Sequence, residues 1–245
     1  MSRFMSAVAF VAALIFNSSV AFGYTVQDVA GGGVLKGKIT FSGTAPDPVR
    51  IPIEKNPEVC GTGFREIKEV TVDKSGGLQH SVVYFQKIDT GKKWPTPDKG
   101  WQLKQKTCTF VPWIQVVPNK SELEVESQDP VLHNIHTYEL IGDVRVTMFN
   151  EAQPTQGYTF KMNIKMRKGT TMKVECDAHN FMHAYTKVLD NPYYAITAPD
   201  GTYSIDNVPP GKYKVIVWHS LLGETSMDVD IGAGKTAELN HKFTK

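Results

Sequence analysis

The segment ITAPDGTYSIDNVPPGKYKVIVWH, residues 196–219, decides the fold class because it alternates strand-like runs with two tight turns. Asp200-Gly201 suits a two-residue hairpin, and Pro210-Gly211 suits a turn in which glycine adopts a positive φ. The runs between these turns are short and rich in Val, Ile, Tyr and Trp, which is typical of β-strands. The segment therefore predicts antiparallel β-structure at the C-terminal end of the chain.

Working outward, short segments rich in β-branched and aromatic residues recur along the chain, with Gly, Pro, Asn and Asp between them. We expect strands within residues 34–43, 80–88, 113–118, 122–127, 171–176, 184–190 and 225–232. No amphipathic helix longer than two turns is expected, although a short helical turn is expected in 52–60 or 148–158. The pattern predicts an all-β protein built as a sandwich with Greek-key connections.

Residues 197–217 resemble the carboxypeptidase regulatory-like module, a small transthyretin-like β-sandwich with the pattern T-x-x-D-G-x-[FY]-x-I-x-x-[VL]-P-x-G-x-Y-x-[VL]. That family also begins with a strand of the form GxVxGxVxxxG, which residues 33–43, GVLKGKITFSG, fit approximately. The resemblance implies a C-terminal module over 191–245, to which the strand in 24–44 also belongs if the larger domain over 45–190 is an insertion. The alternative leaves the N-terminal strand as an ordinary edge strand of the larger domain.

The N-terminus has the form of an export signal. One Arg precedes an apolar run from Phe4 to Phe16, and small residues cluster around Ala21 and Gly23. This pattern predicts a cleaved secretory signal peptide over residues 1–23, with a retained anchor as the alternative. We therefore expect a periplasmic or secreted protein with no membrane span in the mature chain.

Composition and charge exclude some classes of partner. Hydrophobic residues make up 41% of the chain and charged residues 21%, which predicts a packed core. The formal net charge is only +2, and no basic block with interleaved aromatic residues occurs. Nucleic acid is therefore not an expected partner.

The chain has three cysteines, an odd number for an exported protein. The simplest arithmetic pairs Cys60 with Cys108 in a disulfide and leaves Cys176 free. A free thiol in an oxidising compartment needs a reason to exist, and metal binding is the leading one.

Residues 174–185, VECDAHNFMHAY, place Cys176, His179 and Met182 in one loop. Thiolate and imidazole ligands suit copper or zinc, and a thioether favours copper. A mononuclear copper site needs a second histidine, and the segment ELEVESQDPVLHNIHTYEL offers His133 or His136. On a regular strand these two side chains point to opposite faces, so only one of them can reach the site.

DPVLHNI and the later CDAHNFM together resemble the ligand motifs of the cupredoxin family, which includes plastocyanin, pseudoazurin and azurin. The resemblance covers roughly residues 45–190 and implies a Greek-key cupredoxin-like β-sandwich that binds copper. It implies His133, Cys176 and His179 as equatorial ligands and Met182 as the axial ligand. Asn134 would steady the ligand loop by hydrogen bonding, as the family's equivalent asparagine does.

The sequence departs from the family in two ways. The H-x2-M spacing is shorter than in plastocyanin and looks like the end of the copper loop of cytochrome oxidase subunit II, without its second cysteine. His136 and His183 are extra histidines, less favoured as ligands, either of which could displace Met182 or contact a partner.

From this we expect an exported copper protein that transfers electrons and is not an enzyme. The expected exit for electrons is an exposed edge of His179, toward a redox partner such as a c-type cytochrome or an exported oxidoreductase. The alternatives are a copper carrier or sensor, and a binding or adhesion module that uses the fold without metal. No Ser-His-Asp arrangement, phosphate-binding loop or haem-attachment motif is found in the sequence.

Overall fold

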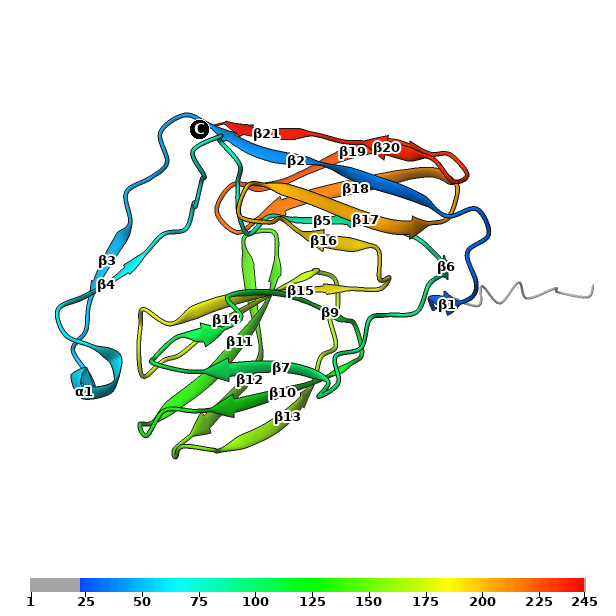
Figure 1. Cartoon of the computed structure of the whole chain (residues 1–245). Coiled ribbons are helices and arrows are strands. Elements are labelled where there is room, and N and C mark those ends of the chain that lie inside the picture. The colour runs from blue at the N-terminus through cyan, green and yellow to red at the C-terminus, as the bar shows by residue number, and fades with distance from the viewer. Residues whose placement is uncertain (1–22, 245) are drawn as a thin grey trace, which may run out of the picture.

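The computed structural model describes residues 23–244 and is built almost entirely of β-strands (Figure 1). The predicted all-β class is confirmed, and the strands form two stacked sandwiches. The signal peptide expected over residues 1–23 lies outside the described residues, apart from Gly23. No helix among the described residues is long and apolar enough to cross a membrane.

The first sandwich lies lower in Figure 1 and consists of two sheets from the middle of the chain. One sheet has the order β13–β10–β7–β8, formed by Thr159–Asn163, Glu122–Ser127, Trp101–Gln105 and Phe110–Val111. The other has the order β12–β11–β14–β15–β9, formed by Val144–Gln153, His133–Ile141, Thr171–Glu175, His183–Leu189 and Ile114–Pro118. Alternate side chains of these strands face inward and form one apolar core.

The second sandwich lies above the first and takes its strands from both ends of the chain (Figure 1). One sheet has the order β16–β5–β18–β19, formed by Tyr194–Ile196, Val82–Phe85, Gly211–His219 and Gly223–Ile231. The other joins β17 and β20 to either side of β2, with β21 also on β2; these strands are Thr202–Val208, Thr236–Glu238, Gly33–Ser42 and His241–Thr244.

Strand pairing puts β2 in one sheet with C-terminal strands and differs from the expected bounds at β5. β2 pairs with β17, β20 and β21, all of which follow the first sandwich in sequence. β5 lies within the range 45–190 but pairs with β16 and β18 of the second sandwich. All four β5 residues are buried, because one face packs inside its own sandwich and the other faces the first sandwich. The sequence gives no local sign of this, since the partners of β5 come more than a hundred residues later.

The remaining elements are short. β1 (Thr25–Val26) pairs with β6 (Thr90–Gly91), and β3 (Val49–Pro52) pairs with β4 (Phe64–Ile67). Between β3 and β4 stands the helical turn α1 (Pro57–Cys60), which lies in one of the two segments where such a turn was predicted. The other segment, residues 148–158, continues β12 as far as Gln153.

We call residues 49–67, which contain β3, α1 and β4, the flap. It leaves the second sandwich and descends along the side of the first (Figure 1). Ile51, Ile53, Val59 and Ile67 pack against the core of the first sandwich. The predicted disulfide between Cys60 and Cys108 is confirmed, and it fastens α1 to the loop between β7 and β8. The flap is thus held by both apolar packing and a covalent link.

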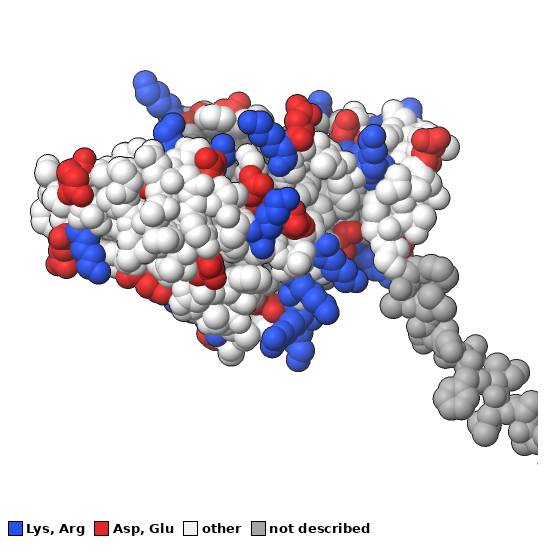
Figure 2. All heavy atoms as spheres, turned by 90° about the horizontal axis from the view of Figure 1, so that it is seen from below, with Lys and Arg blue, Asp and Glu red and all other residues white. Residues whose placement is uncertain are grey.

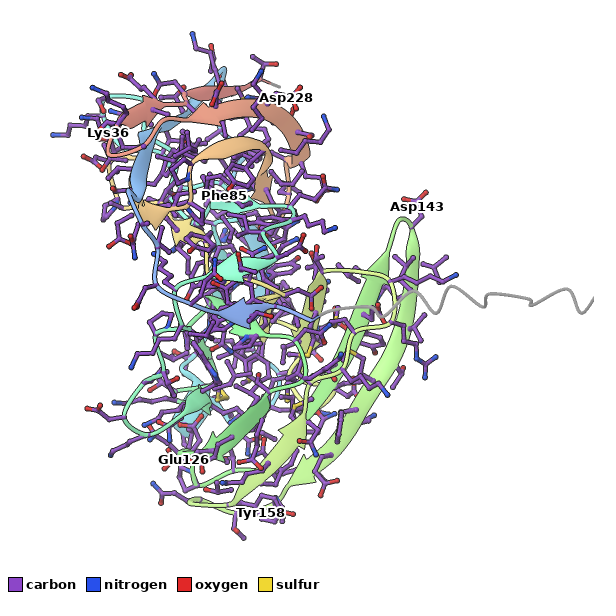
Figure 3. All side chains as sticks on the ribbon, turned by 90° about the vertical axis from the view of Figure 1, so that its right-hand side faces the viewer. Lys36, Phe85, Glu126, Asp143, Tyr158 and Asp228 are labelled. Carbon is purple, nitrogen blue, oxygen red and sulfur yellow. A yellow bond between two sulfur atoms is a disulfide. The ribbon has the colours of Figure 1, made fainter. Side chains whose placement is uncertain are left out.

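A view from the side shows the two sandwiches as separate layers, with the β11–β12 hairpin standing out toward Asp143 at its tip (Figure 3). On the face seen from below, acidic and basic side chains are interspersed over a largely uncharged surface (Figure 2). This face therefore presents no field of a single sign.

The two sandwiches meet through a third apolar cluster, in which β5 and β18 pack against β9 and β15. A fully buried lysine, Lys187, lies at this junction. Its amine donates to the hydroxyls of Thr170 at 2.8 Å and Thr171 at 3.0 Å. It also lies 5.0 Å from the ring centre of Tyr84 and 4.9 Å from that of Trp218.

Burial lowers the pKa of Lys187 to about 8. The unfolded chain, in which lysine titrates near its usual value, then binds more protons than the folded chain between these two pKa values. Burial of Lys187 therefore lowers the free energy of unfolding at neutral pH, and this penalty becomes smaller as pH rises toward the usual lysine pKa. We expect the free energy of unfolding to rise by on the order of 1–2 kcal/mol from pH 7 to 9.5. Chemical denaturation at several pH values measures this. Lys187→Met is the matched control, and an equal rise in that variant would contradict the assignment.

Candidate metal centre

The loop between β14 and β15 carries Cys176, His179 and Met182 and is closed by its own backbone. The Cys176 amide donates to the Met182 carbonyl at 3.2 Å, and the His179 amide donates to the Cys176 carbonyl at 3.2 Å. The Met182 amide donates to the His179 carbonyl at 2.9 Å. These three bonds fold the loop tightly, and all three side chains are buried.

His133 comes from the start of β11, the strand next to β14. His136 pairs with Glu175 across these strands, which brings the end of β14 and the following Cys176 beside the start of β11. His133 and Ile135 are fully buried on one face of β11, whereas the His136 side chain is 16% exposed on the other. The alternation predicted from the sequence is therefore confirmed.

The structure brings His133, Cys176 and His179 together in a small triangle of ligand atoms. The two Nδ1 atoms are 3.1 Å apart, and Cys176 Sγ lies 3.8 Å from His133 Nδ1 and 3.7 Å from His179 Nδ1. A point equidistant from three atoms with these separations lies about 2.1 Å from each of them. Bonds from a bound metal to imidazole nitrogen measure about 2.0–2.1 Å and those to thiolate sulfur about 2.3 Å. The triangle therefore has the dimensions of a three-ligand metal site.

The hydrogen bonds of the outer ring nitrogens fix the tautomers of both histidines. His133 Nε2 donates to a carboxylate oxygen of Asp129 at 2.9 Å, and His179 Nε2 donates to the side-chain oxygen of Asn56 at 3.1 Å. With the ring protons on Nε2, both Nδ1 atoms present lone pairs to the same point. Two lone pairs this close repel each other unless a proton or a metal ion lies between them, so the donor set fits a bound metal ion.

Asp129 is itself held in place. Its two oxygens accept the Thr107 amide at 2.6 Å and the Cys108 amide at 2.8 Å. The carboxylate is buried and can turn away from His133 only by giving up these bonds. It therefore orients the imidazole from behind and supplies negative charge near the site.

Burial governs the protonation of the ligands. It raises the pKa of the Cys176 thiol, partly offset by hydrogen bonds from the backbone of Asn134, His179 and Ala178. Burial, followed by the charges of His133 and Lys55, lowers the pKa of His179 to about 4. At neutral pH His179 is therefore neutral, as a metal ligand must be, whereas the Cys176 thiol would have to lose its proton to bind a metal.

Asn134 ties β11 to the ligand loop, as the resemblance implied. Its side-chain oxygen accepts hydrogen bonds from the backbone amides of Asp177 at 2.6 Å and Ala178 at 3.3 Å. The backbone amide of Asn134 donates to Cys176 Sγ at 3.5 Å. Its side-chain nitrogen donates to Asp177 at 2.9 Å and to Asn150 at 2.9 Å. The loop and the first histidine are therefore held in one hydrogen-bonded unit.

We expect Asn134→Ala to weaken metal binding about 10- to 100-fold, because the loop loses the bonds that aim Cys176 at the site. Competition with a chelator of known affinity measures the change. Asn150→Ala is the matched control, since Asn150 contacts Asn134 and reaches the ligand loop only through one bond to the Asp177 carboxylate at 3.2 Å, without binding a loop amide. Equal affinities in the two variants would show that Asn134 does not position the loop.

The other expected residues lie around this triangle. Met182 is buried at the end of the loop, within the core of the first sandwich. His136 points away from the triangle and contacts Asp177 at 3.1 Å. His183 contacts Glu69 at 2.9 Å, and neither histidine belongs to the clustered ligand atoms.

The expectation that His179 offers an exposed edge is wrong. The residue is only 2% exposed, and its outer nitrogen is covered by Asn56 of the flap. His179 lines a small hollow together with Glu54, Lys55 and Asn180. The cause is the flap, which the sequence did not place near this loop.

Sequence reasoning also missed Asp129 and Asn56. Asp129 stands four residues before His133, in QDPVLH. A carboxylate so close in sequence to a ligand histidine could have been considered as its hydrogen-bond partner. Asn56 is 123 residues from His179 in sequence and carries no motif. Only the path of the flap brings it to the site.

Comparison with known proteins adds little detail. The family model described as polysaccharide lyase family 4, domain II matches residues 176–239, well under half of the chain. A search of curated proteins found no match.

Several solved structures are similar to part of the chain. A purple cupredoxin from Nitrosopumilus maritimus is 16% identical, with 36% of this chain and 99% of that one covered and a TM-score of 0.31. Amicyanin from Paracoccus versutus is 12% identical, covering 39% and 86% with a TM-score of 0.32. The Cu-containing nitrite reductase from Thermus scotoductus is 12% identical, covering 43% and 25% with a TM-score of 0.30. At scores this low the likenesses establish neither family nor function, and the copper hypothesis rests on the ligand geometry.

Proposed function

We propose that this protein binds one copper ion in a type-1-like site and transfers electrons. His133, Cys176 and His179 are the equatorial ligands and Met182 is the axial ligand. The observation that carries the proposal is the buried triangle of two Nδ1 atoms and one Sγ atom. Two imidazoles with one thiolate, and a thioether nearby, are the donor set of blue-copper sites rather than of structural zinc sites.

When bound, copper supplies a one-electron couple between its two oxidation states. The chain's own residues keep the ligands in place for both states: Asp129 and Asn56 hold the imidazoles, and Asn134 holds the loop. The apolar core around Cys176 excludes water. A site that is rigid before the metal arrives needs little rearrangement on electron transfer.

The surface over His179 is the proposed contact for a redox partner. Glu54 and Lys55 of the flap and Asn180 of the loop line it, so a partner such as a c-type cytochrome or an exported oxidoreductase would touch the flap as well as the loop. Charges of both signs in this hollow favour a transient encounter over a tight complex.

We further propose that the protein is periplasmic or secreted and is not an enzyme. The confirmed disulfide supports an oxidising compartment. We also propose that the second sandwich is a carboxypeptidase regulatory-like module, which the turn pattern of residues 197–217 supports.

A copper carrier is the second candidate, because the extra histidines, His136 and His183, flank the ligand loop. The flap argues against it. A carrier must release its metal readily, whereas here a disulfide-tethered segment covers His179. The third possibility is a binding module without metal. It does not account for the two buried Nδ1 atoms that face each other.

Copper retention during redox cycling tests the proposal. Copper-loaded protein is reduced with ascorbate and reoxidised with ferricyanide several times, with a Cu(I) chelator present throughout. An electron-transfer protein keeps its copper and returns to the same spectrum after each cycle. Transfer of most of the copper to the chelator in the first reduced state would favour the carrier.

A further inference from the structure

The disulfide of the flap lies directly against the metal centre. The sulfur atoms of Cys60 and Cys108 and a ring nitrogen of His179 all fall within 4.8 Å of one another. All three residues are buried. His179 turns Nδ1 toward Cys176 and Nε2 toward the flap, where the side-chain oxygen of Asn56 accepts its hydrogen bond. One imidazole therefore stands between two sulfur-containing clusters.

We propose that the reduced form of this disulfide is a second metal site, in which the Cys60 and Cys108 thiolates and His179 bind a thiophilic ion such as Cu(I) or Zn(II). Two thiolates with one imidazole are a donor set that both ions accept. The inference concerns the flap side of His179 and does not require that the first site transfer electrons.

Formation of the site needs two electrons from an external thiol or phosphine. The reductant breaks the S–S bond, each sulfur takes up a proton, and the reductant leaves as its disulfide or phosphine oxide. Metal binding then releases the two thiol protons as the thiolates become ligands. His179 binds through its flap-side nitrogen, with Asn56 giving up its hydrogen bond.

The thiols stay together after reduction because the flap has other attachments. Four of its five isoleucine and valine side chains pack on the core of the first sandwich. Arg65 of β4 donates to the carbonyls of Cys60 at 2.8 Å and Thr107 at 3.2 Å, which bridges both sides of the former bond. The sulfurs need to separate only to about 3.8 Å, the spacing set by two bonds of about 2.3 Å to a tetrahedral ion.

The surroundings carry charges of both signs, because the Asp129 carboxylate lies within 4.8 Å of the Cys108 sulfur. The guanidinium of Arg65 lies beside the Cys60 backbone, and a nearby cation stabilises a thiolate. A neutral imidazole has only one unprotonated nitrogen, so His179 binds a metal ion in one of the two sites at a time.

The test uses the full mature chain carrying Cys176→Ser, which removes the thiolate of the first site. The protein is reduced with a phosphine, freed of reductant under anaerobic conditions and assayed for thiols. It then competes for Cu(I) with bicinchoninate, whose coloured complex reports the copper that remains outside the protein. We expect two thiols per chain and removal of one equivalent of Cu(I).

Two controls isolate the site. Oxidised Cys176→Ser has the same first-site residues but no free thiol, and Cys60→Ser/Cys108→Ser/Cys176→Ser, treated with the same reductant, has no cysteine at all. Each control should take at least about tenfold less Cu(I) from the coloured complex than the reduced Cys176→Ser protein does. Adding His179→Gln to the reduced Cys176→Ser protein should weaken binding while the thiol count stays at two.

Two outcomes overturn the proposal. One is equal copper uptake by the reduced protein and the oxidised control, with two thiols present and circular dichroism unchanged. The other is failure of the folded chain to yield thiols under any phosphine concentration that leaves it folded. Neither outcome affects the first site, whose copper band is measured in the oxidised wild-type chain.

Discussion

Copper affinity is expected to fall by more than about 100-fold when Cys176 is replaced by serine, because the site loses its thiolate and its charge. Serine keeps the shape of the side chain but offers a hydroxyl that does not ionise at neutral pH. The two imidazoles then remain as neutral ligands in a buried site, where a cation has no compensating negative charge among its direct ligands. Competition with a chelator at neutral pH measures the affinity of both proteins.

The matched control for this prediction is Met182→Leu, which removes a thioether from the same loop at similar volume. Because Met182 is a weak axial ligand, Met182→Leu should lower the copper affinity far less than Cys176→Ser does. It should mainly change the reduction potential. Circular dichroism of both metal-free variants checks the fold. A Cys176→Ser protein that binds copper as tightly as the wild type would show that the thiol is not a ligand.

The second large effect concerns stability. Cys60→Ser/Cys108→Ser should lower the free energy of unfolding by about 2–4 kcal/mol, the range for a disulfide that closes a loop of this length. The two cysteines are 48 residues apart, so the bond removes many conformations from the unfolded chain. Urea denaturation of the metal-free wild type and double variant measures the difference.

Reduction of the wild type provides the control for that measurement, since it breaks the same bond without changing a side chain. The reduced wild type and the double variant should unfold at nearly the same urea concentration. An unfolding midpoint that does not move in either case would mean that flap packing alone holds the loop. Metal must be absent throughout, because binding to the folded state adds stability of its own.

Local patterns were sufficient to predict the strand-rich class and the ligand loop. Alternation along His133–Ile141 places His133, Ile135, Thr137 and Glu139 on the buried face, as a period of two requires. The C-x2-H-x2-M spacing predicted a tight loop, and the structure closes it with three backbone bonds. Cysteine counting was enough for the disulfide because only one pair remained once Cys176 was assigned elsewhere.

What could not be predicted depends on contacts between distant parts of the chain. The short run Val82–Phe85 looks like any apolar strand, and nothing in its sequence predicts that it pairs with β16 and β18. The flap sequence around Asn56 likewise carries no sign that it covers His179. Exposure of a ligand is set by whatever packs over it, so the exposed edge expected of His179 from its place in a loop could not be checked without the fold.

The buried lysine shows the same limit. TKVLD reads as a strand end that mixes polar and apolar residues, and a lysine there usually reaches solvent. In the structure Lys187 is enclosed because the second sandwich covers this face of β15. The two sandwiches therefore create an environment that neither segment alone predicts.

The most direct test of the central claim is the visible absorption spectrum of the oxidised mature protein after addition of one equivalent of copper(II). A thiolate and two imidazoles around copper predict an intense thiolate-to-copper charge-transfer band that saturates at one copper per chain. A weak spectrum of the kind given by nitrogen and oxygen ligands alone would contradict it, because Cys176 would then lie beside the metal without binding it.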